Sequence, residues 1–120
     1  MSLAVLLVSG LALIVVNTPA RAAFPGKNGK IVFSNSRAGN NSEIYVMNPN
    51  GSGVQRLTED QFAPATDLSP TWSADGTRIA FSRDFDIYSM NADGSNRTQL
   101  TNNADAEYNP TWSPDGSRIA

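Results

Sequence analysis

Residues 43–58 read EIYVMNPNGSGVQRLT, and residues 86–101 read DIYSMNADGSNRTQLT, 43 positions further along the chain. A second phrase also recurs, because SPTWSADGTRIAFS at residues 69–82 returns as NPTWSPDGSRIA at residues 109–120. A fixed period of about 40 residues with several short strands in each repeat is typical of β-propellers. The repeat therefore predicts an all-β fold that is built from propeller blades.

Side-chain alternation and turn residues divide each repeat into strands. In residues 78–82, Ile79 and Phe81 lie on one face of the expected strand, while the residues between them lie on the other. Four similar turns separate such segments, each with Ser or Asn first, Asp or Asn third and Gly fourth. This pattern favours a three-residue hairpin loop with a bulge at the glycine. These turns begin at Asn48, Ser73, Asn91 and Ser113.

The repeats predict one complete four-stranded blade, one three-stranded blade and a partial third blade. The units span about residues 30–58, 69–101 and 110–120. In the complete unit, strands are expected near residues 70–73, 78–83, 86–91 and 97–101. In the first unit, which lacks an inner strand, they are expected near residues 30–34, 43–48 and 54–58. The third unit supplies an inner strand near residues 110–113 and reaches Ala120 within its second strand, so we expect part of a longer propeller.

The N-terminal segment has the pattern of an export signal. Residues 3–16 are apolar apart from one serine and one glycine, and Ala20-Arg21-Ala22 then provides the small residues of a cleavage site. This pattern predicts a secretory signal peptide over residues 1–22 and a mature region over residues 23–120. No Lys or Arg precedes the apolar run, and an uncleaved membrane anchor is the alternative, although the run is short for a bilayer span.

The composition excludes several kinds of site. The chain contains neither histidine nor cysteine, which removes the usual general base, disulfides and thiolate metal sites. A net charge of −2 without a basic run offers no electrostatic attraction for nucleic acid. We therefore predict no catalytic, cofactor-binding or metal-binding residues in this sequence, and no nucleic-acid partner.

Some acidic residues could bind calcium through their oxygen atoms. Neighbouring carboxylates occur in three pairs, which are Glu59 with Asp60, Asp84 with Asp86, and Asp105 with Glu107. The spacing of an EF-hand loop is absent, so solvated loop residues are the stronger interpretation. The turns themselves account for Asp75, Asp93 and Asp115.

Aromatic residues recur at equivalent positions of the repeats, which favours packing between blades over ligand stacking. They are Trp72 with Trp112, and Tyr45 with Tyr88. The loops at residues 35–42 and 59–68 are longer than their counterparts and are candidates for partner binding at the propeller rim. The Asn-x-Ser/Thr triplets at Asn40, Asn50 and Asn96 would matter only in a glycosylating pathway.

The motif P-x-W-S-x-D-G-x-x-I-A-F-S, followed by D/E-I-Y-x-M-N-x-D/N-G-S and L-T, resembles the WD40-like repeat of the TolB-type β-propeller family. It is carried by Pro70, Trp72, Ser73, Asp75, Gly76, Ile79, Ala80, Phe81, Ile87, Tyr88, Met90, Asn91, Asp93, Gly94, Leu100 and Thr101. The resemblance covers about residues 29–120. It implies a six-bladed propeller in the complete family fold and a non-catalytic role in protein interaction in the cell envelope.

One departure limits what the resemblance implies. The namesake of the family has a small α/β domain before its propeller, whereas repeat sequence begins here at Lys30. The partners of that protein are therefore not carried over to this chain.

The sequence thus predicts an exported, periplasmic or extracellular module without a cofactor, which binds another protein through the rim or channel of its propeller. After signal cleavage we expect no membrane span. The alternative is the N-terminal propeller of a serine peptidase of the dipeptidyl-peptidase or prolyl-oligopeptidase kind. A ring assembled from several copies and a vestigial product without function are the weaker interpretations.

Overall fold

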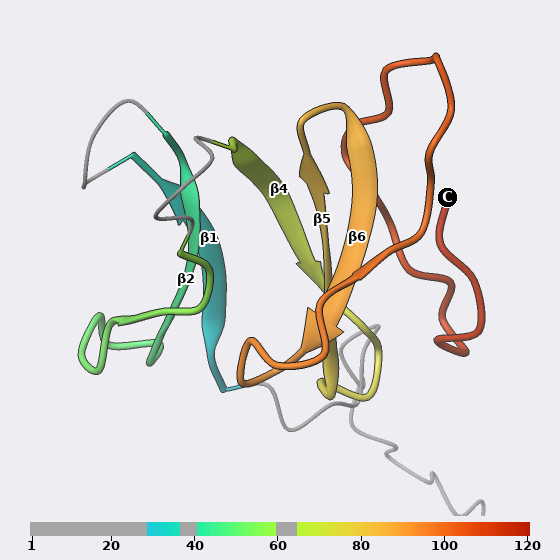
Figure 1. The fold of residues 1–120 in the computed structure, drawn as a ribbon. Coiled ribbons are helices and arrows are strands. Elements are labelled where there is room, and N and C mark those ends of the chain that lie inside the picture. Colours follow the sequence, from blue (N-terminus) through green and yellow to red (C-terminus); the bar gives the residue numbers. More distant parts are fainter. Residues whose placement is uncertain (1–28, 37–40, 60–64) are drawn as a thin grey trace, which may run out of the picture.

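The computed structural model describes residues 29–36, 41–59 and 65–120. The predicted signal peptide, Asn40, Asp60 and parts of the two long loops lie outside the described residues. Within the described ranges there are seven strands and no helix, and hence no helix that could cross a membrane. The strands form two antiparallel sheets (Figure 1), which confirms the predicted all-β fold.

The two sheets have the predicted numbers of strands. The first sheet contains β1 (Ile31–Asn35), β2 (Glu43–Met47) and β3 (Gln55–Arg56), in that order. The second contains β4 (Asp67–Trp72), β5 (Arg78–Arg83), β6 (Asp86–Asn91) and β7 (Thr98–Gln99). One three-stranded blade and one complete blade therefore follow each other along the chain.

Some strand boundaries differ from those predicted. The inner strand β4 begins at Asp67, earlier than expected, because the Asp67 N–H donates to the carbonyl of Ser42 at 2.8 Å and the residue pairs with Arg83. The outer strand β7 is shorter than expected, since the N–H groups of both Leu100 and Thr101 donate to the Ile87 carbonyl. Two neighbouring donors on one carbonyl interrupt the alternation of an antiparallel ladder.

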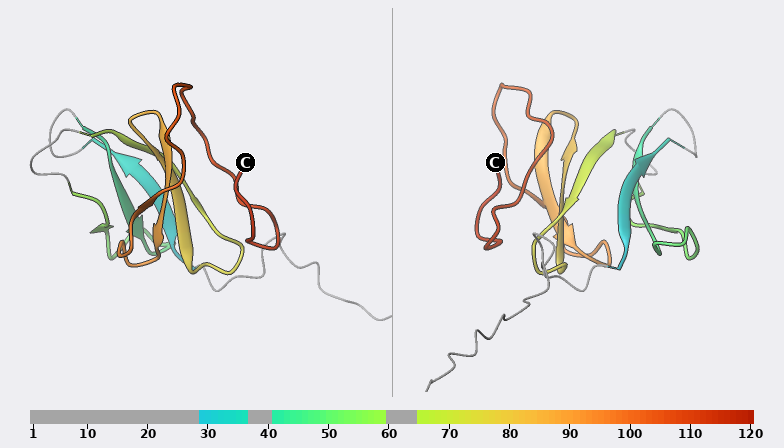
Figure 2. Two further views of the ribbon diagram at one scale, coloured as in Figure 1. Left: turned by 45° about the vertical axis from the view of Figure 1, so that its right-hand side comes forward. Right: turned by 180° about the vertical axis from the view of Figure 1, so that it is seen from behind.

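The third unit forms no strand, so the strand predicted at residues 110–113 is wrong. It retains a single β-bridge, between Trp112 and Ile119. Figure 2 shows that this segment lies beside the second sheet, on the side away from the first. The three units are therefore arranged side by side, as successive blades are.

The turns that begin at Asn48 and Asn91 are the predicted three-residue hairpin loops. The N–H of each asparagine donates at 2.9 Å to the carbonyl of the serine four residues on. The glycines of these turns, Gly51 and Gly94, have φ values of +82° and +87°. That left-handed conformation is the one in which glycine avoids a steric penalty.

The turns that begin at Ser73 and Ser113 are one residue longer than predicted. Here the N–H of the serine donates at 2.9 Å to the carbonyl of the arginine five residues on, Arg78 or Arg118. Each serine hydroxyl also accepts the N–H of that arginine. This additional hydrogen bond fixes the four-residue loop.

The core lies between the two sheets. Ile44 and Val46 of β2 pack against Ile79 and Phe81 of β5 and against Met90 of β6. All five side chains are almost completely buried. Because the core joins residues of both repeats, each blade depends on its neighbour for a buried face.

Gly94 provides a test of this contact between the blades. A Cβ atom at Gly94 would lie 2.7 Å from the carbonyl oxygen of Leu57 in the first unit, whereas one at Gly51 would meet nothing within 4 Å. We expect Gly51→Ala to lower the free energy of unfolding by about 1 kcal/mol through its positive φ alone. Gly94→Ala should lower it by about 2–3 kcal/mol, because a steric clash is added. Urea denaturation measures both, and equal effects would contradict the contact.

Candidate functional site

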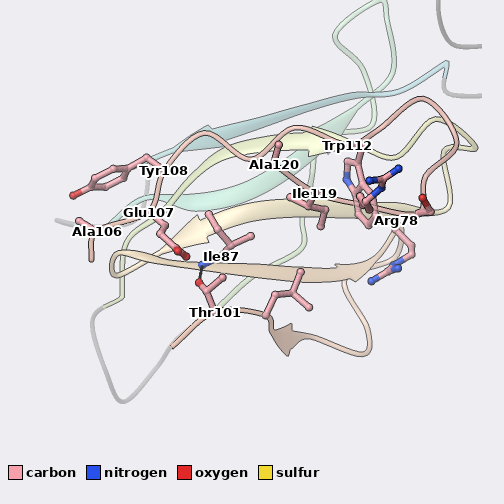
Figure 3. A pocket seen from close by; sticks show the side chains of 12 residues that line it. Arg78, Ile87, Thr101, Ala106, Glu107, Tyr108, Trp112, Ile119 and Ala120 are labelled. Atoms are coloured by element: carbon pink, nitrogen blue, oxygen red, sulfur yellow. Dashed lines mark hydrogen bonds between the residues drawn. The ribbon is translucent and has the colours of Figure 1, made fainter. Parts of the chain in front are cut away.

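A groove of about 710 Å³ lies between the second sheet and the third unit. Figure 3 shows its walls, with Ile87 and Thr101 on one side and Trp112, Ile119 and Ala120 on the other. Leu100 also lines the groove and is 44% exposed. By size and apolar lining it would suit a ligand.

The repeat assigns this groove to packing between blades. Its residues Ile87 and Leu100 are the equivalents of Ile44 and Leu57 in the first unit. There, Ile44 is fully buried beneath the second sheet and packs in the same cluster as Phe81. The third unit reaches Ala120, the equivalent of the residue before Phe81. The groove is therefore a second copy of an interblade surface.

Buried polar residues connect the first two blades. The Thr58 hydroxyl accepts the N–H of Ile44 at 2.9 Å and donates to the Glu43 carboxylate at 2.6 Å. Asp67, at the start of β4, is completely buried beside Thr58. Its Oδ1 atom lies 3.4 Å from Arg83 Nη1, while its Oδ2 atom has no partner among the described residues.

This burial changes the acidity of Asp67. Loss of solvent raises the pKa of Asp67 to about 6, although the Thr58 hydroxyl and the Arg83 charge oppose the rise. A second carboxylate, Glu43, contributes to it by repulsion.

A similar but more exposed arrangement lies between the second sheet and the third unit. The Thr101 hydroxyl accepts the N–H of Ile87 at 2.8 Å and approaches the Asp86 carboxylate at 3.5 Å. Glu107 is the repeat equivalent of Asp67 and lies less deeply. Hydrogen bonds from Thr101 and then Asn103 lower the pKa of Glu107. The sequence analysis missed both clusters, although the repeated Leu-Thr pairs at residues 57–58 and 100–101 were their signal.

The turn carboxylates have the structural role that was predicted. Asp75 accepts hydrogen bonds from the Ser73 hydroxyl at 2.7 Å and from the N–H and hydroxyl of Thr77. These bonds lower the pKa of Asp75 to about 2, and an equivalent set lowers that of Asp115 to about 2. Two hydrogen bonds from Ser95 likewise lower the pKa of Asp93.

Asp84 and Asp86, one of the three neighbouring carboxylate pairs, have separate hydrogen-bond partners. Asp84 accepts the N–H of Thr66 at 3.0 Å, whereas Asp86 accepts the side-chain amide of Gln99 at 3.0 Å. In the described part of the chain, no group of three or more acidic residues could hold a metal ion.

The repeated tryptophans take part in the packing between blades, as predicted, whereas each repeated tyrosine stacks on a phenylalanine of its own blade. Trp112 is buried beneath the Arg78 guanidinium, which lies 4.9 Å from its ring centroid and thus joins the third unit to β5. Trp72 packs against the core cluster. Tyr45 stacks on Phe33 and Tyr88 on Phe81, with centroid distances of 5.7 and 5.9 Å.

The rim has one feature that the sequence analysis missed. Phe85 and Tyr108 are exposed and in contact with each other. The Asp84-Phe85 pair forms the turn between β5 and β6, where a glycine is usual, and this unusual turn residue was the signal in the sequence.

Comparison with known proteins agrees with the fold. A segment of 56 residues, 43% of this chain, is 44% identical to the Tol-Pal system protein TolB of Anaeromyxobacter dehalogenans (strain 2CP-C), and it covers 12% of the length of that protein. Residues 14–120 match the family model described as the TolB beta propeller domain. Since that match covers most of the chain, this protein belongs to the TolB β-propeller family.

Proposed function

We propose that the chain is an exported, non-catalytic propeller module that binds another protein through the rim or the channel of its propeller. This proposal rests on one observation, which is that the repeated polar side chains form hydrogen bonds inside the fold. The carboxylates of the turns and those between the blades are bonded within the framework, as in Asp75 and Glu43. Exposed side chains at the rim, such as Phe85, Leu68 and Tyr108, remain available to contact a partner.

Two further observations support the proposal. The sequence of residues 1–22 has the pattern of a secretory signal, which favours a location in the periplasm or outside the cell. The related protein is named as a member of the Tol-Pal system, and this name favours a role among other proteins. Its own partners are not transferred, because the matched segment covers only 12% of it.

Photo-crosslinking of the tagged full chain in the organism that encodes it tests the proposal. We place benzoylphenylalanine at Leu68 on the rim or, as a control, at Thr98 on the outer strand β7. The Leu68 position should give discrete adducts with another protein, in a chain that has lost residues 1–22 and is found in the envelope or the medium. A cytoplasmic chain, adducts from Thr98 alone, or peptide hydrolysis by the purified chain would contradict the proposal.

A further inference from the structure

Two exposed aromatic side chains form a pair on one rim of the blades. Phe85 is 60% exposed and Tyr108 is 51% exposed. Their ring centroids are 5.9 Å apart and their planes meet at 83°, which is the edge-to-face arrangement. Tyr108 also lines the interblade groove, and Figure 3 shows its ring pointing outward from it. Phe85 is not among the residues that line the groove, so the pair extends the surface beyond it.

The backbone holds this aromatic pair in place. Phe85 belongs to the tight turn between β5 and β6, and its carbonyl accepts the N–H of Glu107 at 2.8 Å. The carboxylate of the preceding residue, Asp84, accepts the N–H of Thr66. These bonds attach the turn to the segments on both sides of it. A surface that is fixed before binding loses little conformational entropy when a partner arrives.

Phe85 occupies a backbone conformation that does not suit it. Asp84 and Phe85 are the two central residues of the turn, with φ values of +47° and +79°, and Arg83 pairs with Asp86 across it. Such turns favour Asn-Gly or Asp-Gly, and a positive φ is unfavourable for an aromatic residue. The exposed ring of Phe85 gains little burial in return. Strain of this kind is typical of functional surfaces.

The repeat shows that this position lies on the rim even where a neighbouring blade is present. Leu68 of β4 is the equivalent of Tyr108 and remains 37% exposed, although β4 has the first sheet beside it. By contrast, Ile44, the equivalent of Ile87 in the groove, is fully buried by its neighbour. Packing between blades therefore does not account for the aromatic pair.

The charges around the pair indicate the chemistry of the partner. Residues 83–86 and 105–108 contain four carboxylates and one arginine, and that arginine, Arg83, lies beside the buried Asp67. The faces of aromatic rings also attract cations. We propose that Phe85 and Tyr108 bind a basic and apolar segment of a partner protein, with an arginine or lysine side chain on the rings. This inference rests on the proposed function and names the kind of partner.

Phe85→Gly separates binding from stability. Glycine suits the positive φ, so the thermal midpoint of the variant should be unchanged or higher. Binding of a fluorescein-labelled (Arg-Leu)₄ peptide to the full chain, measured by fluorescence anisotropy, should weaken about tenfold or more, because an aromatic anchor is lost. Val54→Ala removes an exposed apolar side chain from the first unit and should leave binding unchanged. Added salt should weaken binding of the peptide, and a (Glu-Leu)₄ peptide should not bind.

The outcomes distinguish this inference from the proposed function. Absence of (Arg-Leu)₄ binding, equal binding by the wild type and Phe85→Gly, or equal binding of the acidic peptide would overturn the inference. If Phe85→Gly still forms the crosslinked adducts of the wild type, the proposed function stands without this site. If the wild type forms none, the proposed function itself fails.

Discussion

Replacing Phe81 by alanine should lower the free energy of unfolding by about 3–5 kcal/mol, since a large buried side chain is removed and a cavity remains. Phe81 is completely buried between the sheets and belongs to the cluster that joins them. A small domain has a total stability of only about 5–15 kcal/mol. We therefore expect a largely unfolded population of this variant at moderate urea concentrations.

Phe33→Ala is the matched control for Phe81→Ala. Phe33 holds the same repeat position in β1 and also stacks on a tyrosine, but it is only partly buried. Its replacement should lower the free energy of unfolding by about 1–2 kcal/mol, in proportion to the smaller area it buries. Urea denaturation followed by tryptophan fluorescence measures both variants. Equal effects would show that the two sheets do not share a core.

The repeat allowed most of the fold to be predicted, because equivalent residues form equivalent strands. The limits of β5 and β6 agree with the prediction, and both strands combine alternating side chains with a turn at each end. The Trp72 and Trp112 positions were correctly assigned to packing, since a structural role explains their recurrence in the second and third units. The sequence repeat therefore predicted both the strands of the blades and the packing role of the two tryptophans.

Features that depend on several segments were not predictable in this way. The length of the Ser73 turn depends on a hydrogen bond to Arg78, and the early start of β4 depends on Ser42, the residue before β2. The pair of Phe85 and Tyr108 joins residues that do not recur in the first unit. Alternation within one strand contains no information about such contacts.

Asp67 should make stability depend on pH between about 4 and 6. Burial raises the pKa of Asp67 to about 6 in the folded chain, whereas an unfolded aspartate titrates near pH 4. The folded state thus binds the proton more tightly in this range, and the free energy of unfolding falls as the pH rises through it. The loss should reach about 2–3 kcal/mol at pH 7. The charged groups that face Asp67 are Arg83, Arg97 and Glu43, and the two arginines moderate the effect.

Asp67→Asn should abolish this dependence and raise the stability at pH 7, because the amide is neutral at every pH and has a similar shape. Asp115→Asn is the control, since the pKa of Asp115 is lowered to about 2 and its contribution is lost only in more acidic solution. Urea denaturation at a series of pH values between 4 and 7 measures the three chains. If the wild type gains stability as the pH rises from 4 to 6, Asp67 does not have the raised pKa that its burial implies.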